Sequence, residues 1–404
     1  MSPGSRPLSR RLFGLARILV ALTLLVWVAK NLPWSDELSY RGDDGVERKI
    51  GGQLEGDWKA DLVRFVPADP AALDEHWPAG AREELARGEP VLAKRRADSE
   101  ATGFDWHPGM PRAFRTMDLS GLLFAQGLFL VAVLTIVTRW WRLLDLAGCP
   151  TSWGNALRLT FLGLFFNNVI PGATGGDVVK GVVVARENPG RGAEALVTVL
   201  VDRVFGLIAL ALLALFVILL APDEGPLVDL RTYLLWGLGL FAVGLALYAS
   251  KKVRRKTGLS ALVDRLPLAE KLRSLDRAAM LYMKRPRPVA IAFVISFANH
   301  VLVTLGAVEL GWALGVPKSE VSLTDYFVLV PVANLISAVP LAPGGWGVGE
   351  LAFAGLFRMV GASGAMGVAV SVTYRLSQLG IGLLGGIFML FPSSRTEVRQ
   401  ARAD

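Results

Sequence analysis

The chain has 404 residues, of which 52% are hydrophobic and only 19% are charged, and its mean hydropathy is +0.45. Soluble domains carry about 25% charged residues, so this composition excludes a soluble enzyme and indicates a protein whose main solvent is the lipid bilayer. The single cysteine, Cys149, excludes an intramolecular disulfide and a cysteine-based zinc site.

The net charge of +8 is unevenly distributed along the chain. Residues 33–117 carry 12 Lys and Arg against 17 Asp and Glu, out of 43 and 35 in the whole chain, so the remainder carries 31 against 18. The positive excess therefore lies around the hydrophobic segments. It indicates cytoplasmic loops that face anionic lipid, and no nucleic-acid partner is expected.

The first hydrophobic run, Leu12–Ala29, follows three arginines and resembles a signal peptide. The run is long, however, and Trp27 occupies a position where cleavage would require a small residue. We therefore expect residues 1–32 to form an uncleaved signal-anchor helix with its N-terminus in the cytoplasm.

Residues 33–117 interrupt the hydrophobic pattern with acidic sequence that is rich in Pro and Gly. Val46–Ile50 and Leu62–Val66 alternate in polarity as strands do, whereas Ala71–Glu75 and Ala81–Arg87 have helical patterns. These residues predict a small extracytoplasmic α+β insertion, and they contain no motif to which a chemistry can be assigned.

Five further segments are long enough to cross about 30 Å of hydrocarbon. They are Leu119–Thr138, Ala195–Leu220, Tyr233–Ala249, Val289–Val316 and Gly364–Phe391. With the anchor, they predict about six spanning helices, the later ones in a transmembrane domain at 118–392 that precedes a cytoplasmic tail at 393–404. The positive-inside rule places Arg139 and Arg142, which close the second span, in the cytoplasm, and Trp140 beside them is expected to be an interfacial anchor.

Two hydrophobic segments do not fit as spans, because the flanks of each lie on one side of the membrane. Leu157–Ala185 lies between two cytoplasmic flanks, and Leu323–Val360 lies between two outer flanks. Pro and Gly break each segment midway into arms of about 13–17 residues, a length typical of re-entrant pieces. We predict two re-entrant helical hairpins, one from each face of the membrane.

The two predicted hairpin tips share a spacing. Asn168–Asp177 reads NVIPGATGGD and Ser337–Glu350 reads SAVPLAPGGWGVGE, so that each contains Pro-x-x-x-Gly-Gly followed by a carboxylate. The spans around the two tips run in opposite directions. The predicted fold is therefore an all-α polytopic membrane protein with an inverted repeat, the arrangement in which transporters place substrate at broken helices.

Several ionisable residues fall inside the membrane, where they are costly and usually face a partner. Asp177 and Lys180 are one helical turn apart and able to pair locally. In a polar cavity formed by Asp177, Arg203, Glu350 and Arg375, the arginines would bind a phosphate bidentately while the carboxylates orient them. In the alternative interpretation, ion pairs only hold the broken helices in register.

Enzymatic motifs are mostly missing. Gly361–Gly364 resembles the serine motif of rhomboid proteases, but no histidine follows it, and Thr174–Asp177 departs from the presenilin-like motif at its first residue. There is no His-Glu-x-x-His and no Walker A loop. We therefore expect a protein that is not an enzyme, with no metal and no cofactor, and we expect His300 to be a packing residue.

The order of motifs resembles the lysylphosphatidylglycerol synthase transmembrane family, whose members are also called flippase-like domain proteins. The resemblance covers about residues 119–391 and rests on Asn168–Asp177, Asp202–Gly206, Pro340–Glu350 and Tyr374–Arg375. It implies a multi-pass protein of the cytoplasmic (inner) membrane that translocates, or helps to handle, a lipid with a polar head. The soluble aminoacyl-transferase domain of the synthases is not present in the chain.

We therefore expect a flippase-like transporter that moves or presents a lipid with an anionic or phosphate head group. Two alternatives stay open: an intramembrane enzyme acting on a polyprenyl or glycerophospholipid, and a non-catalytic membrane partner of a separate lipid or glycosyl transferase. The predicted substrate-binding residues are those of the motifs: Asn168, Pro171, Gly175, Gly176, Asp177, Lys180, Asp202, Arg203, Pro340, Pro343, Gly344, Gly345, Glu350, Tyr374 and Arg375.

Overall fold

The computed structural model describes residues 26, 34–69, 71, 73, 75–95, 102–169, 175–220, 227–249, 282, 284–338 and 346–387. The predicted anchor, apart from Val26, and the predicted cytoplasmic tail lie outside the described residues. So do the centres of both hairpin tips, 170–174 and 339–345, and part of the predicted helix Ala71–Glu75.

A five-stranded antiparallel sheet forms most of the N-terminal part. Its strands are β1 (Asp36–Arg41), β2 (Glu47–Glu55), β3 (Leu62–Pro67), β4 (Val91–Lys94) and β5 (Gly103–His107), in the spatial order β4-β3-β2-β1-β5, and it is joined by α2 (Ala79–Ala86). Alternate residues of each strand point into one core, in which Trp58, Trp77 and Trp106 are buried. The sequence predicted parts of β2, β3 and α2 but missed the other three strands.

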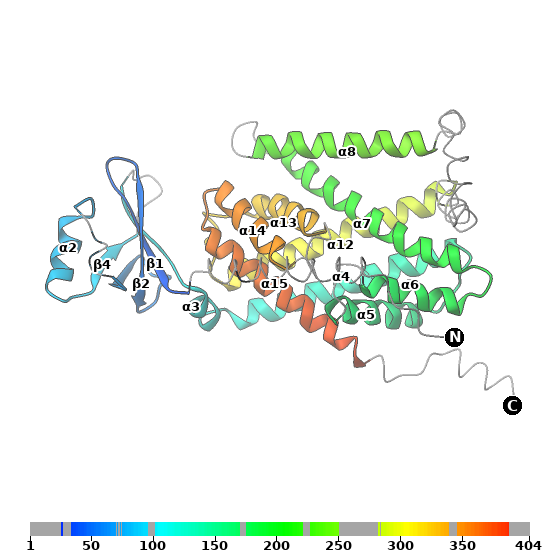
Figure 1. The fold of residues 1–404 in the computed structure, drawn as a ribbon, viewed down its shortest axis with the longest axis horizontal. Coiled ribbons are helices and arrows are strands. Elements are labelled where there is room, and N and C mark those ends of the chain that lie inside the picture. The colour runs from blue at the N-terminus through cyan, green and yellow to red at the C-terminus, as the bar shows by residue number, and fades with distance from the viewer. Residues whose placement is uncertain are drawn as a thin grey trace, which may run out of the picture.

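The sheet is tied to the helices by the buried carboxylate of Asp36. This carboxylate accepts hydrogen bonds from the backbone N–H groups of Leu54 and Gly109, both at 2.8 Å, and from Arg112 Nε at 2.7 Å. Arg112 belongs to the short helix α3 (Met110–Arg115), in which Met110 and Ala113 are buried in the same core as α13 and α14, described below. The sheet is thereby fixed at one end of the helical bundle (Figure 1).

Within the described residues, three helices are long and apolar enough to cross a membrane, namely α4 (Leu119–Leu146), α7 (Gly192–Leu220) and α12 (Pro286–Ala313). Two further helices, α8 (Leu227–Ala249) and α15 (Gly364–Leu384), match two other predicted spans. The Asp118 side chain caps α4 by accepting from the N–H groups of Ser120 and Gly121. The Asp118 N–H donates to the Ala313 carbonyl at the end of α12, so α4 and α12 run antiparallel. The total of six spanning helices stays a prediction.

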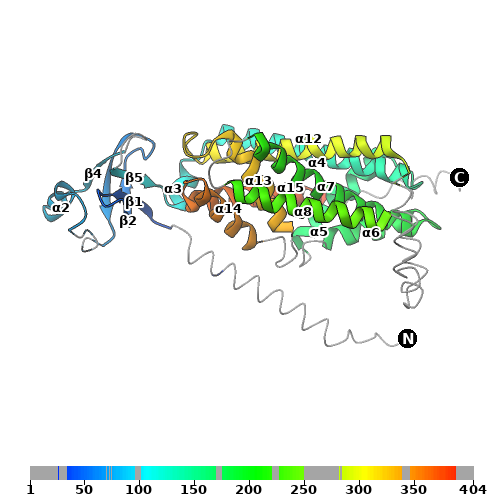
Figure 2. The ribbon, with the colours of Figure 1, turned by 90° about the horizontal axis from the view of Figure 1, so that it is seen from above.

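Each predicted hairpin is a pair of helices separated by a break. The first pair is α5 (Trp153–Val169) and α6 (Gly175–Glu187), and the second is α13 (Leu323–Ala338) and α14 (Val348–Met359). The partners pack on each other within each pair. Figures 1 and 2 show α13 and α14 at the end of the bundle that carries the sheet, and α5 and α6 toward the opposite end.

Packing between the helices follows the inverted repeat. If α4, α5, α6 and α7 correspond to α12, α13, α14 and α15, each contact has a counterpart. The contacts α6–α7 and α14–α15 correspond, as do α7–α13 and α15–α5, α4–α5 and α12–α13, and α7–α12 and α15–α4. The α4–α12 contact maps onto itself, so these two helices lie on either side of the pseudo-twofold axis that relates the halves.

Two predictions at the end of the second span are wrong. Helix α4 continues past the predicted end of the span at Thr138 to Leu146, and Arg139 within it is only 4% exposed. Trp140, expected at the interface, is fully buried and donates from its Nε1 to Thr198 at 3.0 Å. Arg139 is buried because it has a carboxylate partner within the bundle, described below, and its side of the membrane stays a prediction.

Candidate functional site

Two arginines occupy the same place in the two halves of the repeat. Arg203 is the twelfth residue of α7 and Arg375 is the twelfth residue of α15. Arg203 forms an ion pair through its Nε with Asp177, and Arg375 Nε lies 2.5 Å from Glu350 Oε1. The structure thus groups the four residues that the sequence predicted into two equivalent pairs.

The two carboxylates are equivalent as well. Asp177 is the third residue of α6 and Glu350 is the third residue of α14, so both lie in the first turn after the break, where the helix dipole favours negative charge. The Gly347 N–H donates to Glu350 Oε2 at 2.5 Å, and Ser371 donates to its other oxygen at 3.3 Å. Glu350 is only 1% exposed. Each ion pair therefore joins the second helix of a hairpin to the long helix that follows it, α6 to α7 and α14 to α15.

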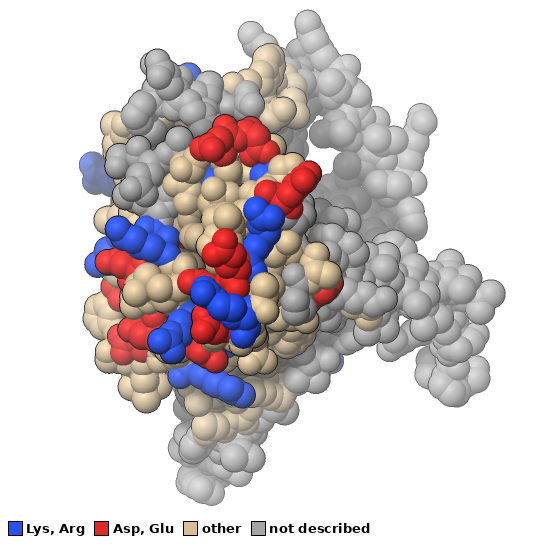
Figure 3. All heavy atoms as spheres, turned by 90° about the vertical axis from the view of Figure 1, so that its left-hand side faces the viewer, with Lys and Arg blue, Asp and Glu red and all other residues tan. Residues whose placement is uncertain are grey.

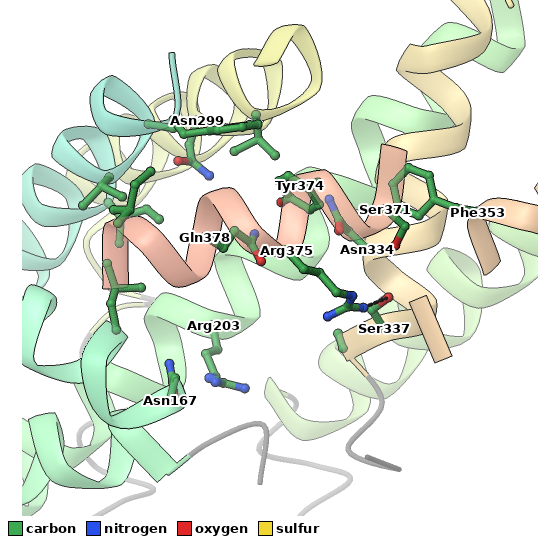
Figure 4. A pocket seen from close by; sticks show the side chains of 18 residues that line it. Asn167, Arg203, Asn299, Asn334, Ser337, Phe353, Ser371, Tyr374, Arg375 and Gln378 are labelled. Carbon is green, nitrogen blue, oxygen red and sulfur yellow. Dashed lines mark hydrogen bonds between the residues drawn. The ribbon is translucent and has the colours of Figure 1, made fainter. Parts of the chain in front are cut away.

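A cavity of about 400 Å³ lies between the halves and is lined by both arginines (Figure 4). Its wall combines apolar side chains with amides and hydroxyls from α4, α5, α7, α12, α13, α14 and α15. The lining residues are Phe129, Ala132, Val133, Ile136, Leu164, Asn167, Arg203, Asn299, Val303, Asn334, Ser337, Ala338, Phe353, Ser371, Tyr374, Arg375, Gln378 and Ile381. The size falls in the range of small-molecule sites.

Hydrogen bonds hold the polar lining in place. Asn167 Oδ1 accepts from the Gly176 N–H at 2.8 Å, which links the two arms of the first hairpin beside the break. Ser337 accepts from Arg375 Nη2 at 3.5 Å at the equivalent place in the second hairpin. Tyr374 is hydrogen-bonded by the amides of Asn334 and Gln378. The cavity therefore has an ordered polar wall on the faces that carry the arginines.

Asp202 does not join this cavity. It pairs with Arg139, whose Nε lies 2.7 Å from Asp202 Oδ1 and whose Nη1 donates to Ser296 at 2.8 Å. All three side chains are buried between α4, α7 and α12. This cluster braces the three long helices, and it matches the alternative in which ion pairs hold the fold.

Lys180 and Asp177 do not form the local pair that their spacing allows. Asp177 pairs with Arg203, whereas Lys180 is buried and its Nζ lies 3.6 Å from the centroid of the Trp140 ring. A cation over an indole face is attracted by the ring quadrupole. Lys180 therefore packs α6 against α4 and is not among the residues that line the cavity.

The remaining predicted site residues lie at or near the breaks. Gly176 packs closely on α5, because a Cβ there would lie 1.7 Å from the Gly163 carbonyl oxygen. Asn168 lies in the last turn of α5 and Gly175 begins α6. Pro171, Pro340, Pro343, Gly344 and Gly345 lie outside the described residues.

Sequence reasoning missed the amides of the cavity and the role of Arg139. Asn299, Asn334 and Gln378 are amide residues within predominantly apolar helices, which is the signal that could have identified them. His300 is a packing residue as expected, since its Nε2 lies 2.9 Å from the Gly206 carbonyl. Within the described part of the chain, no group of three or more His, Cys, Asp or Glu side chains is placed to hold a metal ion.

Comparison with known proteins agrees with this geometry. A UPF0104 membrane protein of Pyrococcus horikoshii is 25% identical over 315 residues, which cover 70% of this chain and 92% of that protein. A UPF0104 membrane protein of Methanothermobacter thermautotrophicus is 25% identical over 277 residues, which cover 62% of this chain and 78% of that protein. A family model described as the lysylphosphatidylglycerol synthase TM region matches residues 102–386, which include all the helices of both repeats. The chain therefore belongs to the family of the lysylphosphatidylglycerol synthase TM region.

Proposed function

We propose that this integral membrane protein moves or presents a lipid with a phosphate-containing polar head. The observation that carries the proposal is the single cavity lined by Arg203 and Arg375, one from each half of the repeat. Guanidinium groups recognise phosphate through parallel N–H donors. The two arginines occupy pseudo-symmetric positions and line the same cavity. A phosphate bound there can therefore contact an arginine from each half of the repeat.

The broken helices support the same proposal. In hydrocarbon, unpaired backbone groups each cost several kcal/mol, so non-helical segments are tolerated only inside the protein or beside a wet cavity. The helix ends that precede the two breaks line the arginine-lined cavity, through Asn167 at the end of α5 and through Ser337 and Ala338 at the end of α13. We propose that the hairpins are re-entrant from opposite faces of the cytoplasmic membrane, with both termini in the cytoplasm and the sheet outside.

The alternative of an intramembrane enzyme finds less support. Asp177 and Glu350 are the carboxylates that could act as a base, and each is engaged by an arginine. The alternative of a lipid-presenting partner keeps one supporting observation, the rigid attachment of the sheet through Asp36, because a fixed outer domain offers a docking surface for a separate transferase.

The experiment that tests the proposal is translocation in reconstituted vesicles. Purified protein is inserted into liposomes that contain a tail-labelled phospholipid, and the accessibility of the label to a membrane-impermeant quencher is followed with time. Transport predicts that the lipid changes leaflet without a chemical change. A chemically altered lipid indicates the enzyme, and an unchanged distribution together with stable binding of a transferase indicates the partner.

A further inference from the structure

We propose that the cavity selects a lipid head group that combines a phosphodiester with uncharged hydroxyls, and that it rejects head groups bearing an ammonium group. This inference rests on the proposed function, because it takes the ligand to be a lipid. It adds the chemical class of the head group, for which the composition of the cavity wall supplies the evidence.

The charges of the wall favour an anion. Arg203 and Arg375 line the cavity, and no Asp or Glu is among the described lining residues. The two nearby carboxylates, Asp177 and Glu350, are each engaged by one of these arginines. The tip residues 170–174 and 339–345 contain no Asp or Glu either. An ammonium group that entered the cavity would meet guanidinium groups and no carboxylate among the lining residues, because the two nearest carboxylates are held by those arginines, and this is unfavourable in a site of low dielectric.

The uncharged part of the wall suits hydroxyl groups. Asn167 and Asn299 use their amide oxygens in hydrogen bonds, and their NH₂ groups make none among the described residues. Ser337, Ser371 and Gln378 add further groups along the same wall. Amides and hydroxyls both donate and accept, as the hydroxyls of a glycerol, inositol or sugar head group do.

An apolar groove next to the cavity indicates that the ligand carries a tail. The groove, of about 290 Å³, lies between α7, α8 and α13, and Val204, Leu207, Phe241 and Leu335 are among its lining residues. Val204 follows Arg203 and Leu335 follows Asn334, so the polar and the apolar site share two helices at adjacent positions. This juxtaposition fits a lipid, with its head at the arginines and an acyl chain in the groove, better than a free phosphate.

The test compares phosphatidylglycerol with lysylphosphatidylglycerol, which differ by an ammonium-bearing aminoacyl group. Two readouts are taken for each: retention on the purified full-length protein, measured by native mass spectrometry, and translocation in vesicles. We expect retention and translocation of phosphatidylglycerol to exceed those of the aminoacylated lipid by about tenfold or more, the effect of one charged contact. Soluble glycerol phosphate should displace the lipid only at a large excess. Displacement at an equal concentration would assign the site to a free phosphate.

A charge-introducing variant makes the test specific to the cavity. Gln378→Glu places a carboxylate in the wall and should shift the preference toward the aminoacylated lipid by about tenfold. Gln126→Glu makes the same change on α4, where Gln126 binds Ser377 and does not line the cavity, and should keep the wild-type preference. Equal or preferred binding of lysylphosphatidylglycerol by the wild type overturns the inference, as does an unchanged preference in a folded Gln378→Glu protein. If phosphatidylglycerol is selectively retained but not translocated, the head-group preference holds and only the transport proposal is refuted. If neither lipid is retained, the inference itself is refuted.

Discussion

Two trios of residues are equivalent in the repeat by residue count but differ in chemistry. Arg139 and Asp202 of the first half form a buried polar cluster with Ser296 of the second half. The corresponding trio consists of Gly306 and Tyr374 of the second half and Phe129 of the first half. Phe129 contacts Tyr374 with ring centroids 5.4 Å apart, and Gly306 leaves the space that the Phe129 ring occupies. One of the two equivalent contacts is thus held by charge and the other by aromatic packing.

Removal of the carboxylate from the polar cluster should destabilise the protein strongly. Asp202→Ala leaves the Arg139 guanidinium buried without its counter-ion, and breaking a buried pair in this way costs about 3–5 kcal/mol. Asp145→Ala, at an exposed position near the end of the same helix as Arg139, is the matched control and should change stability by about 0.5 kcal/mol or less. Thermal unfolding of both variants in the same detergent measures the difference. Equal melting temperatures would show that the cluster does not brace the helices.

His107 gives the sheet a dependence on pH whose sign follows from its environment. Burial lowers the pKa of His107 below its usual value near 6.5, against the opposing attraction of Asp105. The folded sheet therefore favours the neutral ring, so this contribution to stability is complete above the unfolded pKa and declines as the pH falls below it. His107→Gln should lose less stability than the wild type between about pH 7.5 and pH 5. Thermal melts at the two pH values measure this, and identical losses would contradict it.

At the scale of elements, hydropathy and Pro-Gly breaks predicted the two hairpins and the five long or apolar helices. Missed were β1, β4 and β5, which are short, and β5 pairs with β1, which lies far from it in the chain. The two halves of the repeat align differently by the Pro-x-x-x-Gly-Gly motif than by the positions of their helices. Asp177 and Glu350 align as third residues of α6 and α14, and the connection 339–347 is longer than 170–174. Local sequence could not show which carboxylate each arginine would meet, because the partners lie on different helices.

The proposed re-entrant arrangement predicts which residues are accessible from the same side of the membrane. In a Cys149→Ser background, cysteines placed at Ser152 and Pro189, the exposed flanks of the first hairpin, should react with an impermeant reagent from one side. A cysteine at Ser319, before the second hairpin, should react from the other side. Labelling in right-side-out and inverted vesicles measures this. Labelling of Ser152→Cys and Pro189→Cys from opposite sides would show that the segment crosses the membrane completely.

At the scale of the molecule, the sheet is a fixed extension of the second half. The Trp58 indole donates to Thr116 at 3.0 Å and packs on Gly315, where a Cβ would lie 2.4 Å from the ring. Figure 3 shows acidic and basic side chains interspersed on this end of the molecule, without separation into faces of one sign. Electrostatic steering of a ligand needs a surface dominated by one sign, so this end is better suited to contact than to attraction at a distance.

The central claim is that one arginine from each half acts on the same lipid phosphate. The most direct measurement is the translocation rate of tail-labelled phosphatidylglycerol in vesicles that contain equal amounts of wild type, Arg203→Ala, Arg375→Ala or Arg158→Ala protein. Arg158 is the control because it pairs with Glu187 at 3.3 Å on the first hairpin, away from the cavity. We expect the translocation rate of Arg203→Ala and of Arg375→Ala to be lower than that of the wild type by about tenfold or more, since each variant removes charged hydrogen bonds. The Arg158→Ala protein should translocate at the wild-type rate. Wild-type rates in both cavity variants would contradict the account.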